Sequence, residues 1–206
     1  MKVFILNCSP HAHGATAAAL DEVRRTLENE GVETESFHIG TDPIQPCVSC
    51  MQCSRTGRCA FEDGVNQVIE KMQTADGLIV GTPVHYAATS GSASVFLDRL
   101  FFAGGKVFHH KPAAGVICCR RAGATNALDE LNKYFTISQM PIVSSQYWNM
   151  VFGRDAEEVQ QDLEGMQTMR TLARNMAWLL RCIQAGKEAG IAPPPREKLV
   201  RTNFIR

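Results

Sequence analysis

Residues 2–16 read KVFILNCSPHAHGAT, an apolar run that leads through a polar loop into a helix-like stretch. Lys2–Asn7 predicts a buried strand, because the apolar run is short and Ser9-Pro10 ends it. Ala15–Glu30 carries apolar residues at roughly helical spacing, and Gly31 follows as a helix stop. A strand, a polar loop and a helix in this order are typical of an α/β fold.

The same alternation continues along the chain. Further strands are expected at Glu33–Ile39, Gly77–Gly81, Ala113–Cys119 and Ile142–Ser145, and helices at Gly64–Gln73, Ser92–Phe102, Thr125–Ser138 and Asp155–Ala185. Strands joined by helices pair in parallel through right-handed crossovers. We therefore expect one domain over residues 1–206: a doubly wound, five-stranded parallel sheet with a cysteine-rich insert at 46–63 and a long C-terminal helix and tail at 154–206.

Composition and charge exclude several classes of protein. The 206 residues hold 21 Lys+Arg against 21 Asp+Glu, so the basic excess of a nucleic-acid binder is missing. The apolar run near the N-terminus spans only Val3 to Leu6 and no cleavage site follows, which argues against a signal peptide. No segment approaches the length of a transmembrane helix. We expect a cytoplasmic protein with reduced thiols and neither a nucleic-acid nor a membrane partner.

Half of the eight cysteines lie within thirteen residues, at Cys47, Cys50, Cys53 and Cys59, with the spacing C-x2-C-x2-C-x5-C. In a reducing compartment this density indicates an iron–sulfur cluster, a zinc site or a loop of unligated thiols, rather than disulfides. Zinc loops usually use two well-separated pairs, so the spacing favours the cluster. The last gap is longer than in the ferredoxin run, where the fourth cysteine serves another cluster, so these four thiolates can surround a single one.

The loop after the first strand has the chemistry of an anion site. Hydroxyl and imidazole groups can donate hydrogen bonds, a glycine lets backbone amides approach closely, and the helix N-terminus adds free N–H groups and positive potential. The candidate residues are Ser9, His11, His13, Gly14, Ala15 and Thr16. The alternative is an ordinary polar turn that caps the helix.

The loop after the first strand and a second loop, at residues 81–91, resemble loops of a known family. The run N-C-S-P-H-x-H-G-x-T at 7–16 is similar to the S-P-R-x-x-G-x-T phosphate loop of the flavodoxin-like, NAD(P)H-dependent FMN reductases. Residues 81–91 resemble that family's second loop, G-[ST]-P-x-Y-x-x-x-x-[ST]-G. The resemblance extends to about Gly153. It departs at His11, where the family often has arginine, and at His85, which takes the tyrosine position one place before Tyr86.

The resemblance implies the flavodoxin-like strand order 2-1-3-4-5 and an FMN site at the strand ends. Pro83, Val84 and either His85 or Tyr86 would form a wall for the flavin ring, with backbone amides beside it. Arg120 or Arg121, in the Gly123-containing loop after the fourth strand, would face the pyrimidine edge and stabilise the reduced, anionic ring.

The cysteine spacing resembles the compact motif of the iron–sulfur flavoproteins, a branch of the same family in which four cysteines hold one [4Fe–4S] cluster. The resemblance implies an FMN-dependent oxidoreductase that takes hydride from NAD(P)H and passes electrons to the cluster or to a small or protein acceptor, such as a flavin or a quinone. It also implies a homodimer or homotetramer. Two alternatives remain: a non-enzymatic electron carrier of the flavodoxin type, and a zinc-stapled binding module.

Overall fold

In the computed structural model, residues 1–195, 197–198, 200, 202 and 204 are described. Five strands form one parallel sheet in the order β2-β1-β3-β5-β6, and the short β4 pairs antiparallel with β3. The strands are β1 (Lys2–Asn7), β2 (Glu33–His38), β3 (Gly77–His85), β4 (Ala88–Thr89), β5 (Ala113–Cys119) and β6 (Met150–Phe152). The expected order 2-1-3-4-5 of a flavodoxin-like sheet is therefore confirmed for the parallel strands.

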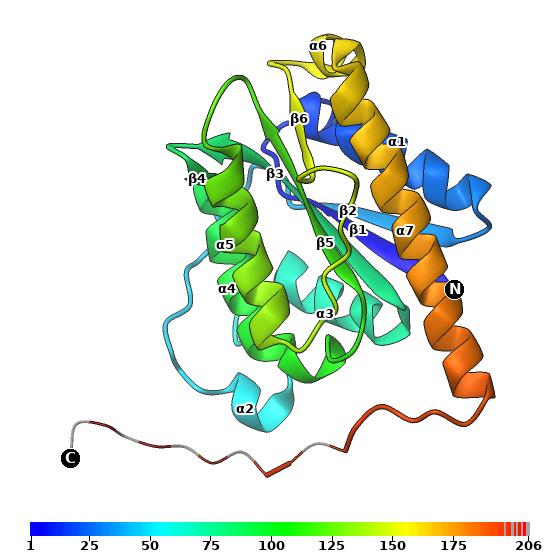
Figure 1. Cartoon of the computed structure of the whole chain (residues 1–206). Coiled ribbons are helices and arrows are strands. Elements are labelled where there is room, and N and C mark those ends of the chain that lie inside the picture. The colour runs from blue at the N-terminus through cyan, green and yellow to red at the C-terminus, as the bar shows by residue number, and fades with distance from the viewer. Residues whose placement is uncertain (196, 199, 201, 203, 205–206) are drawn as a thin grey trace.

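Helices cover both faces of this sheet (Figure 1). They are α1 (Ala15–Asn29), α2 (Cys53–Thr56), α3 (Gly64–Thr74), α4 (Gly91–Gly104), α5 (Ala124–Ile137), α6 (Ala156–Gln161) and α7 (Leu163–Glu188), with a 3₁₀ turn at Gly105–Val107. α1 and α7 pack on one face, while α3, α4 and α5 pack on the other. Because both faces are covered, the central strands are apolar throughout.

In strand β1, successive side chains point to opposite faces of the sheet and so contribute to two separate halves of the core. Val3 and Ile5 point to the α1–α7 side, whereas Phe4 and Leu6 point to the α3–α4–α5 side. All four side chains are at most 2% exposed. A strand in this position is fixed in register, because a slip of one residue would exchange its two faces.

The expected fifth strand at Ile142–Ser145 is wrong. That segment makes one isolated bridge, between Ala113 and Ile142, and the strand that pairs with β5 is β6. The segment turns to α7 instead: the Ser145 hydroxyl donates to the carbonyl of Thr168 at 2.7 Å, and an α7 asparagine donates to Ser144. The Val143 N–H donates to the carbonyl of Ala113 at 2.8 Å, but the next two residues bond to α7, so the segment leaves the sheet after this bridge.

Two expected boundaries also change. β3 continues past Gly81 to His85, because its end folds back on β4 as a hairpin. The expected helix from Asp155 is divided at Asp162, whose carboxylate accepts a hydrogen bond from the Gly165 N–H at 2.9 Å and so caps α7. In the part of the chain that is described, no helix is long and apolar enough to span a bilayer. Positions 196, 199, 201, 203 and 205–206 of the expected tail lie outside the described residues.

Candidate functional site

A cavity of about 750 Å³ lies at the carboxyl ends of β1, β3, β5 and β6. Ligands of doubly wound sheets bind at this edge. Most of the residues expected at a cofactor site line it: Ser9, His11, His13, Gly14, Ala15, Thr16, Pro83, Val84, His85 and Arg120. The fold therefore brings together the loop after β1, the end of β3 and the loop after β5, which are far apart in the sequence.

The loop after β1 is held by its own hydrogen bonds. The Ser9 N–H donates to Asn7 Oδ1 at 3.0 Å, and the His11 N–H donates to Ser9 Oγ at 3.1 Å. The Cys8 N–H donates to the carbonyl of Gly81 at 2.8 Å, which ties the loop to β3. Ser9 is buried, whereas His11 and His13 are exposed at the cavity. The loop is thus held in place by hydrogen bonds, and it presents two exposed imidazole groups at the cavity.

Helix α1 begins at this loop without a side-chain cap. Its N-cap residue is Gly14, and its first turn holds no acidic residue. α5 likewise begins at a glycine, Gly123, without a side-chain cap, whereas α3, α4, α6 and α7 each begin with a carboxylate or hydroxyl that accepts a backbone N–H. A Cβ at Gly14 would lie 3.0 Å from the Cβ of His11, so the backbone approaches that side chain closely. Uncapped amides and a positive helix end fit a phosphate group.

The segment expected as the second flavin loop is a strand end and a tight turn. Pro83, Val84 and His85 belong to β3, and Tyr86 and Ala87 connect it to β4 with φ angles of 50° and 59°. Positive φ at both central residues is the geometry of a type I′ hairpin turn. The His85 side chain lines the cavity, while Tyr86 is fully exposed and does not line it.

Gly123 also lies outside this cavity. It adopts a φ of +90°, and a Cβ there would meet the Cα of Ala87 at 2.7 Å. Glycine is therefore needed at this position so that the loop after β5 can pack against the hairpin turn. Gly123 lines a neighbouring pocket together with Arg121, whereas Arg120 lines the main cavity.

Several lining residues were not expected from the sequence: Pro10, Ala12, Cys118, Cys119, Gly153, Arg154 and Asp155. Burial raises the pKa of Cys118 to about 12, and it also raises that of Cys119, so both thiols stay protonated at neutral pH. Arg154 forms an ion pair with Glu158 at 2.6 Å. The segment 153–155 carries no motif, and it reaches the cavity only because β6 ends directly before it.

The four clustered cysteines line one small, almost wholly apolar cavity, which is closed by Phe61, Phe102 and Arg99. Cys47 and Cys50 are exposed, Cys53 and Cys59 are half-buried, and all four are free thiols. Burial is the main cause that raises the pKa of Cys53, and the other three thiols add to it. Among the described residues, no three Cys, His, Asp or Glu side chains are grouped as a metal site. By its chemistry, a set of four thiols that line one hollow fits a soft metal or an iron–sulfur cluster.

Arg99 of α4 anchors this loop. Its side chain is 1% exposed and forms a two-pronged ion pair with Asp63, at 2.6 and 2.9 Å. Its other N–H groups donate to the carbonyls of Gln45 and Phe61, at 3.2 and 3.3 Å. Its Nε–H donates to the sulfur of Cys59 at 3.2 Å. A single buried guanidinium thus holds both ends of the cysteine loop and contacts one thiol.

Asn66 provides a second anchor for the loop. This side chain is 2% exposed, and its Oδ1 accepts a hydrogen bond from the Cys59 N–H at 2.8 Å. Its Nδ2 donates to the carbonyls of Cys59 and Phe61 at 3.0 and 3.2 Å. A buried amide with its bonds satisfied by a loop backbone fixes that backbone in one conformation.

The doubly wound sheet and a phosphate-suited helix start at its carboxyl edge define a flavodoxin-like protein with a site for a phosphorylated cofactor. The chain belongs to the NADPH-dependent FMN reductase family, whose model matches residues 1–155. Membership of this family makes the protein an oxidoreductase of the FMN-dependent type.

Relatives and a solved structure agree with this family. An iron–sulfur flavoprotein of Methanocaldococcus jannaschii is 27% identical, with 89% of this chain and all of the relative aligned. An iron–sulfur flavoprotein of Methanosarcina thermophila is 24% identical over 91% of this chain and all of the relative. A flavodoxin structure from the domain Archaea shares the fold, with a TM-score of 0.61 and 12% identity over 88% of this chain and 99% of that one. The expected family, in its iron–sulfur flavoprotein branch, is confirmed.

Proposed function

We propose that this protein binds FMN in the cavity at the end of β1, takes hydride from NAD(P)H, and passes the electrons to a [4Fe–4S] cluster or to a small acceptor. The observation that carries the proposal is the uncapped start of α1, which opens with its loop into a cavity of about 750 Å³. Family membership supports the flavin, and the relatives' names support the cluster. The alternative carrier and zinc-module functions become outcomes of the test.

The phosphate of FMN would lie against the loop after β1. Ser9, His11, His13 and the residues Gly14–Thr16 would hold it with hydroxyl, imidazole and backbone N–H donors. His11 stands where the family often has arginine, so an imidazole would be the hydrogen-bond donor to the phosphate at that position.

The ring of FMN would lie toward the end of β3 and the loop after β5. Pro83, Val84 and His85 present a largely apolar wall, and the exposed Arg120 places a positive charge at the cavity. When bound, FMN supplies hydride acceptance and one- or two-electron release. The role of the protein's own residues would be to bind and orient the flavin ring. Arg120 would stabilise the negative charge that develops on this ring. Tyr86 lies at the exposed tip of the hairpin, where a partner or substrate can reach it.

The cysteine loop would hold the cluster through Cys47, Cys50, Cys53 and Cys59. The half-burial of Cys53 and Cys59 limits their contact with water, and the N–H of Arg99 bonds to Cys59. Hydrogen bonds to sulfur and low solvent exposure both tune the potential of such a centre. We choose iron–sulfur over zinc because the matched relatives carry the name iron–sulfur flavoprotein.

The remaining parts of the proposal concern the setting of the protein. All eight cysteines are free thiols, which fits a reducing compartment such as the cytoplasm. The acceptor would be a small molecule or a protein, and the protein would work as a homodimer or homotetramer. The exposed rings of Tyr147 and Trp148 beside the site are consistent with either a substrate or a subunit at that surface.

The test is a spectrum and a metal analysis of anaerobically purified protein, followed by titration with NADPH. We expect bound FMN that NADPH reduces, together with about four iron and four sulfide per chain. Protein without flavin would refute the FMN assignment. Flavin that NADPH does not reduce would make the protein an electron carrier, and zinc in place of iron would refute the cluster.

Matched variants assign the two sites. Gly14→Ala should lower FMN content, because its Cβ would press on His11, whereas Gly105→Ala places a methyl group in open space in the 3₁₀ turn and should leave it unchanged. Cys50→Ser should lower iron content, whereas Cys182→Ser, at an exposed thiol of α7, should not. Equal effects within either pair would contradict the assignment of that site.

A further inference from the structure

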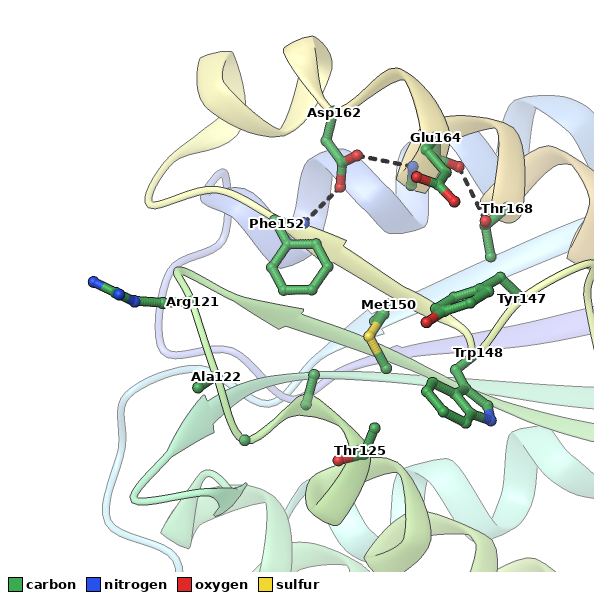
Figure 2. A pocket seen from close by; sticks show the side chains of 13 residues that line it. Arg121, Ala122, Thr125, Tyr147, Trp148, Met150, Phe152, Asp162, Glu164 and Thr168 are labelled. Atoms are coloured by element: carbon green, nitrogen blue, oxygen red, sulfur yellow. Dashed lines mark hydrogen bonds between the residues drawn. The ribbon is translucent and has the colours of Figure 1, made fainter.

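A second cavity, of about 410 Å³, lies beside the proposed FMN site, between the loop after β5, strand β6 and the start of α7. Figure 2 shows the side chains that line it. Its volume lies within the range of about 300–1,000 Å³ that small-molecule sites occupy. None of the residues expected from the cofactor motifs except Gly123 lines it.

Aromatic side chains form the walls of this cavity. Tyr147, Trp148 and Phe152 are 53%, 57% and 41% exposed, so each leaves much of its ring uncovered. The rings of Tyr147 and Trp148 lie side by side, with centroids 5.1 Å apart, and Met150 forms the buried floor between Trp148 and Phe152 (Figure 2). Three partly uncovered rings around one hollow offer flat apolar surfaces on which another ring can stack.

The polar groups of the cavity include the exposed Glu164, whose carboxylate disfavours an anionic occupant. The Asp162 carboxylate accepts hydrogen bonds from the N–H groups of Phe152 at 2.7 Å and Gly165 at 2.9 Å, so it builds the wall (Figure 2). The Arg121 side chain extends away from the hollow (Figure 2). The hydroxyl of Thr125 remains at the rim as a donor or acceptor. An occupant needs flat apolar faces and one polar edge group, such as a carbonyl.

The two cavities share their dividing wall. Arg120 lines the proposed FMN site and Arg121 lines the aromatic pocket, while Gly153 lines the first and Phe152 the second. Consecutive residues of a chain are about 3.8 Å apart, so only the thickness of a loop separates the two hollows. A ring in the aromatic pocket would therefore lie next to the cofactor without competing for its phosphate loop.

We propose that this aromatic pocket binds an uncharged, planar ring compound of the quinone type as the second substrate. The proposal rests on the proposed FMN-dependent function and adds a site for its small acceptor. Overall, NAD(P)H, one proton and the quinone would give NAD(P)⁺ and the hydroquinone, so two electrons and two protons are transferred in balance. The residues that bind the ring are Tyr147, Trp148 and Phe152.

The test uses the two tryptophans of the chain as a matched pair, since Trp148 lies in the pocket and Trp178 lies on the surface of α7, 64% exposed. Indole N–H signals of ¹⁵N-labelled holoprotein are followed by NMR during titration with duroquinone. The four methyl groups of this probe block addition to the exposed thiols. Single Trp→Phe variants assign the two signals.

We expect the Trp148 signal to shift and saturate while the Trp178 signal stays in place. Phe152→Ala should weaken duroquinone binding up to about tenfold, the loss expected for one aromatic contact. Ile137→Ala, at a residue of α5 that is 83% exposed, should leave the affinity unchanged. Equal shifts of both indoles, or a Trp148 signal that does not move while duroquinone is reduced, would overturn the proposal.

Two controls separate this result from neighbouring explanations. If a second copy of the chain covers the pocket, Trp148 does not respond to duroquinone and Trp148→Glu lowers the mass of the assembly, which overturns the proposal. FMN content and NADPH oxidation with ferricyanide are measured on the same samples. Loss of these two would refute the proposed function even if Trp148 still responded, so the two failures are distinguishable.

Discussion

Replacing Arg99 by methionine tests whether one buried guanidinium holds the cysteine loop on the protein. Methionine keeps most of the stem that packs in α4 and removes every polar contact. The variant loses the ion pair with Asp63, the hydrogen bonds to two loop carbonyls and the contact with Cys59. It also loses the cation–π contact with Phe61, whose ring centre lies 5.0 Å from the guanidinium carbon.

The expected cost follows from the burial of the two partners. Removing one partner of a buried ion pair costs roughly 3–5 kcal/mol, because the other charge is left uncompensated. The Asp63 side chain is 35% exposed and still accepts a hydrogen bond from the Val65 N–H at 3.1 Å, so water and α3 partly compensate it. We expect the unfolding free energy to fall by about 3 kcal/mol, the lower end of that range. A domain of ordinary stability stays folded after such a loss.

Urea denaturation measures the global effect, and limited trypsin digestion measures the local one. Arg55 and Arg58 lie inside the loop as trypsin sites, and we expect the anchored conformation of the loop to slow their cleavage. If cleavage follows local opening, a loss of about 3 kcal/mol at the anchor speeds it roughly 100-fold. The control is Arg24→Met, which breaks exposed pairs with Asp21 and Glu28 and should cost at most about 1 kcal/mol. Equal urea midpoints for the two variants, or unchanged cleavage in the loop, would refute the anchoring role.

Three further predictions concern other parts of the fold. Gly123→Ala should lower the unfolding free energy by about 1–3 kcal/mol, measured by urea denaturation, because a side chain is strained at φ +90° and meets the backbone of Ala87. Hydrogen bonds from Lys71 and, to a lesser extent, Lys2 lower the pKa of Glu35. The stability that this carboxylate contributes is therefore present above the unfolded pKa of about 4.5 and is lost as pH falls through the lower folded pKa. Glu35→Gln should lower the thermal unfolding midpoint slightly at pH 7 and have no effect on it near pH 2. Burial raises the pKa of Cys8 strongly, so mass spectrometry should find this thiol unmodified by iodoacetamide in native protein at pH 8 and modified after unfolding.

The sequence predicts four of the five parallel strands well and the strand at the β6 edge poorly. β1 and β5 are found at the expected residues, because strands covered on both faces are continuous apolar runs between turns. Ile142–Ser145 has the same local pattern as a strand, yet after one bridge to Ala113 its residues Ser144 and Ser145 bond to α7. β6 has only three residues, too few for any periodicity. Which of the two segments pairs with β5 depends on tertiary contacts that no local window contains.

The candidate site also has a part that can be predicted from the sequence and a part that cannot. The loop after β1 is predictable because hydroxyls, histidines and a glycine before a helix have a local chemical meaning. Arg99 is not predictable in this way, although a signal exists: it stands between Leu97 and Leu100, on the side of α4 that faces the core. An arginine among buried residues of a helix indicates a buried partner. The partner itself, Asp63, lies 36 residues away and is identified only by the fold.

The cysteine loop leaves the sheet from β2, its edge strand, and rejoins the fold at α3. Between these two points it rests on Arg99 and Asn66 and contributes no strand to the sheet. A surface insertion at an edge can change in length without disturbing the register of the strands, and its closure entropy grows only slowly with length. The cysteine loop can therefore be exchanged while the sheet and its helices stay unchanged. A loop with a different set of metal ligands, joined to the same two anchoring residues, should give a flavin-binding protein that passes its electrons to a different metal centre.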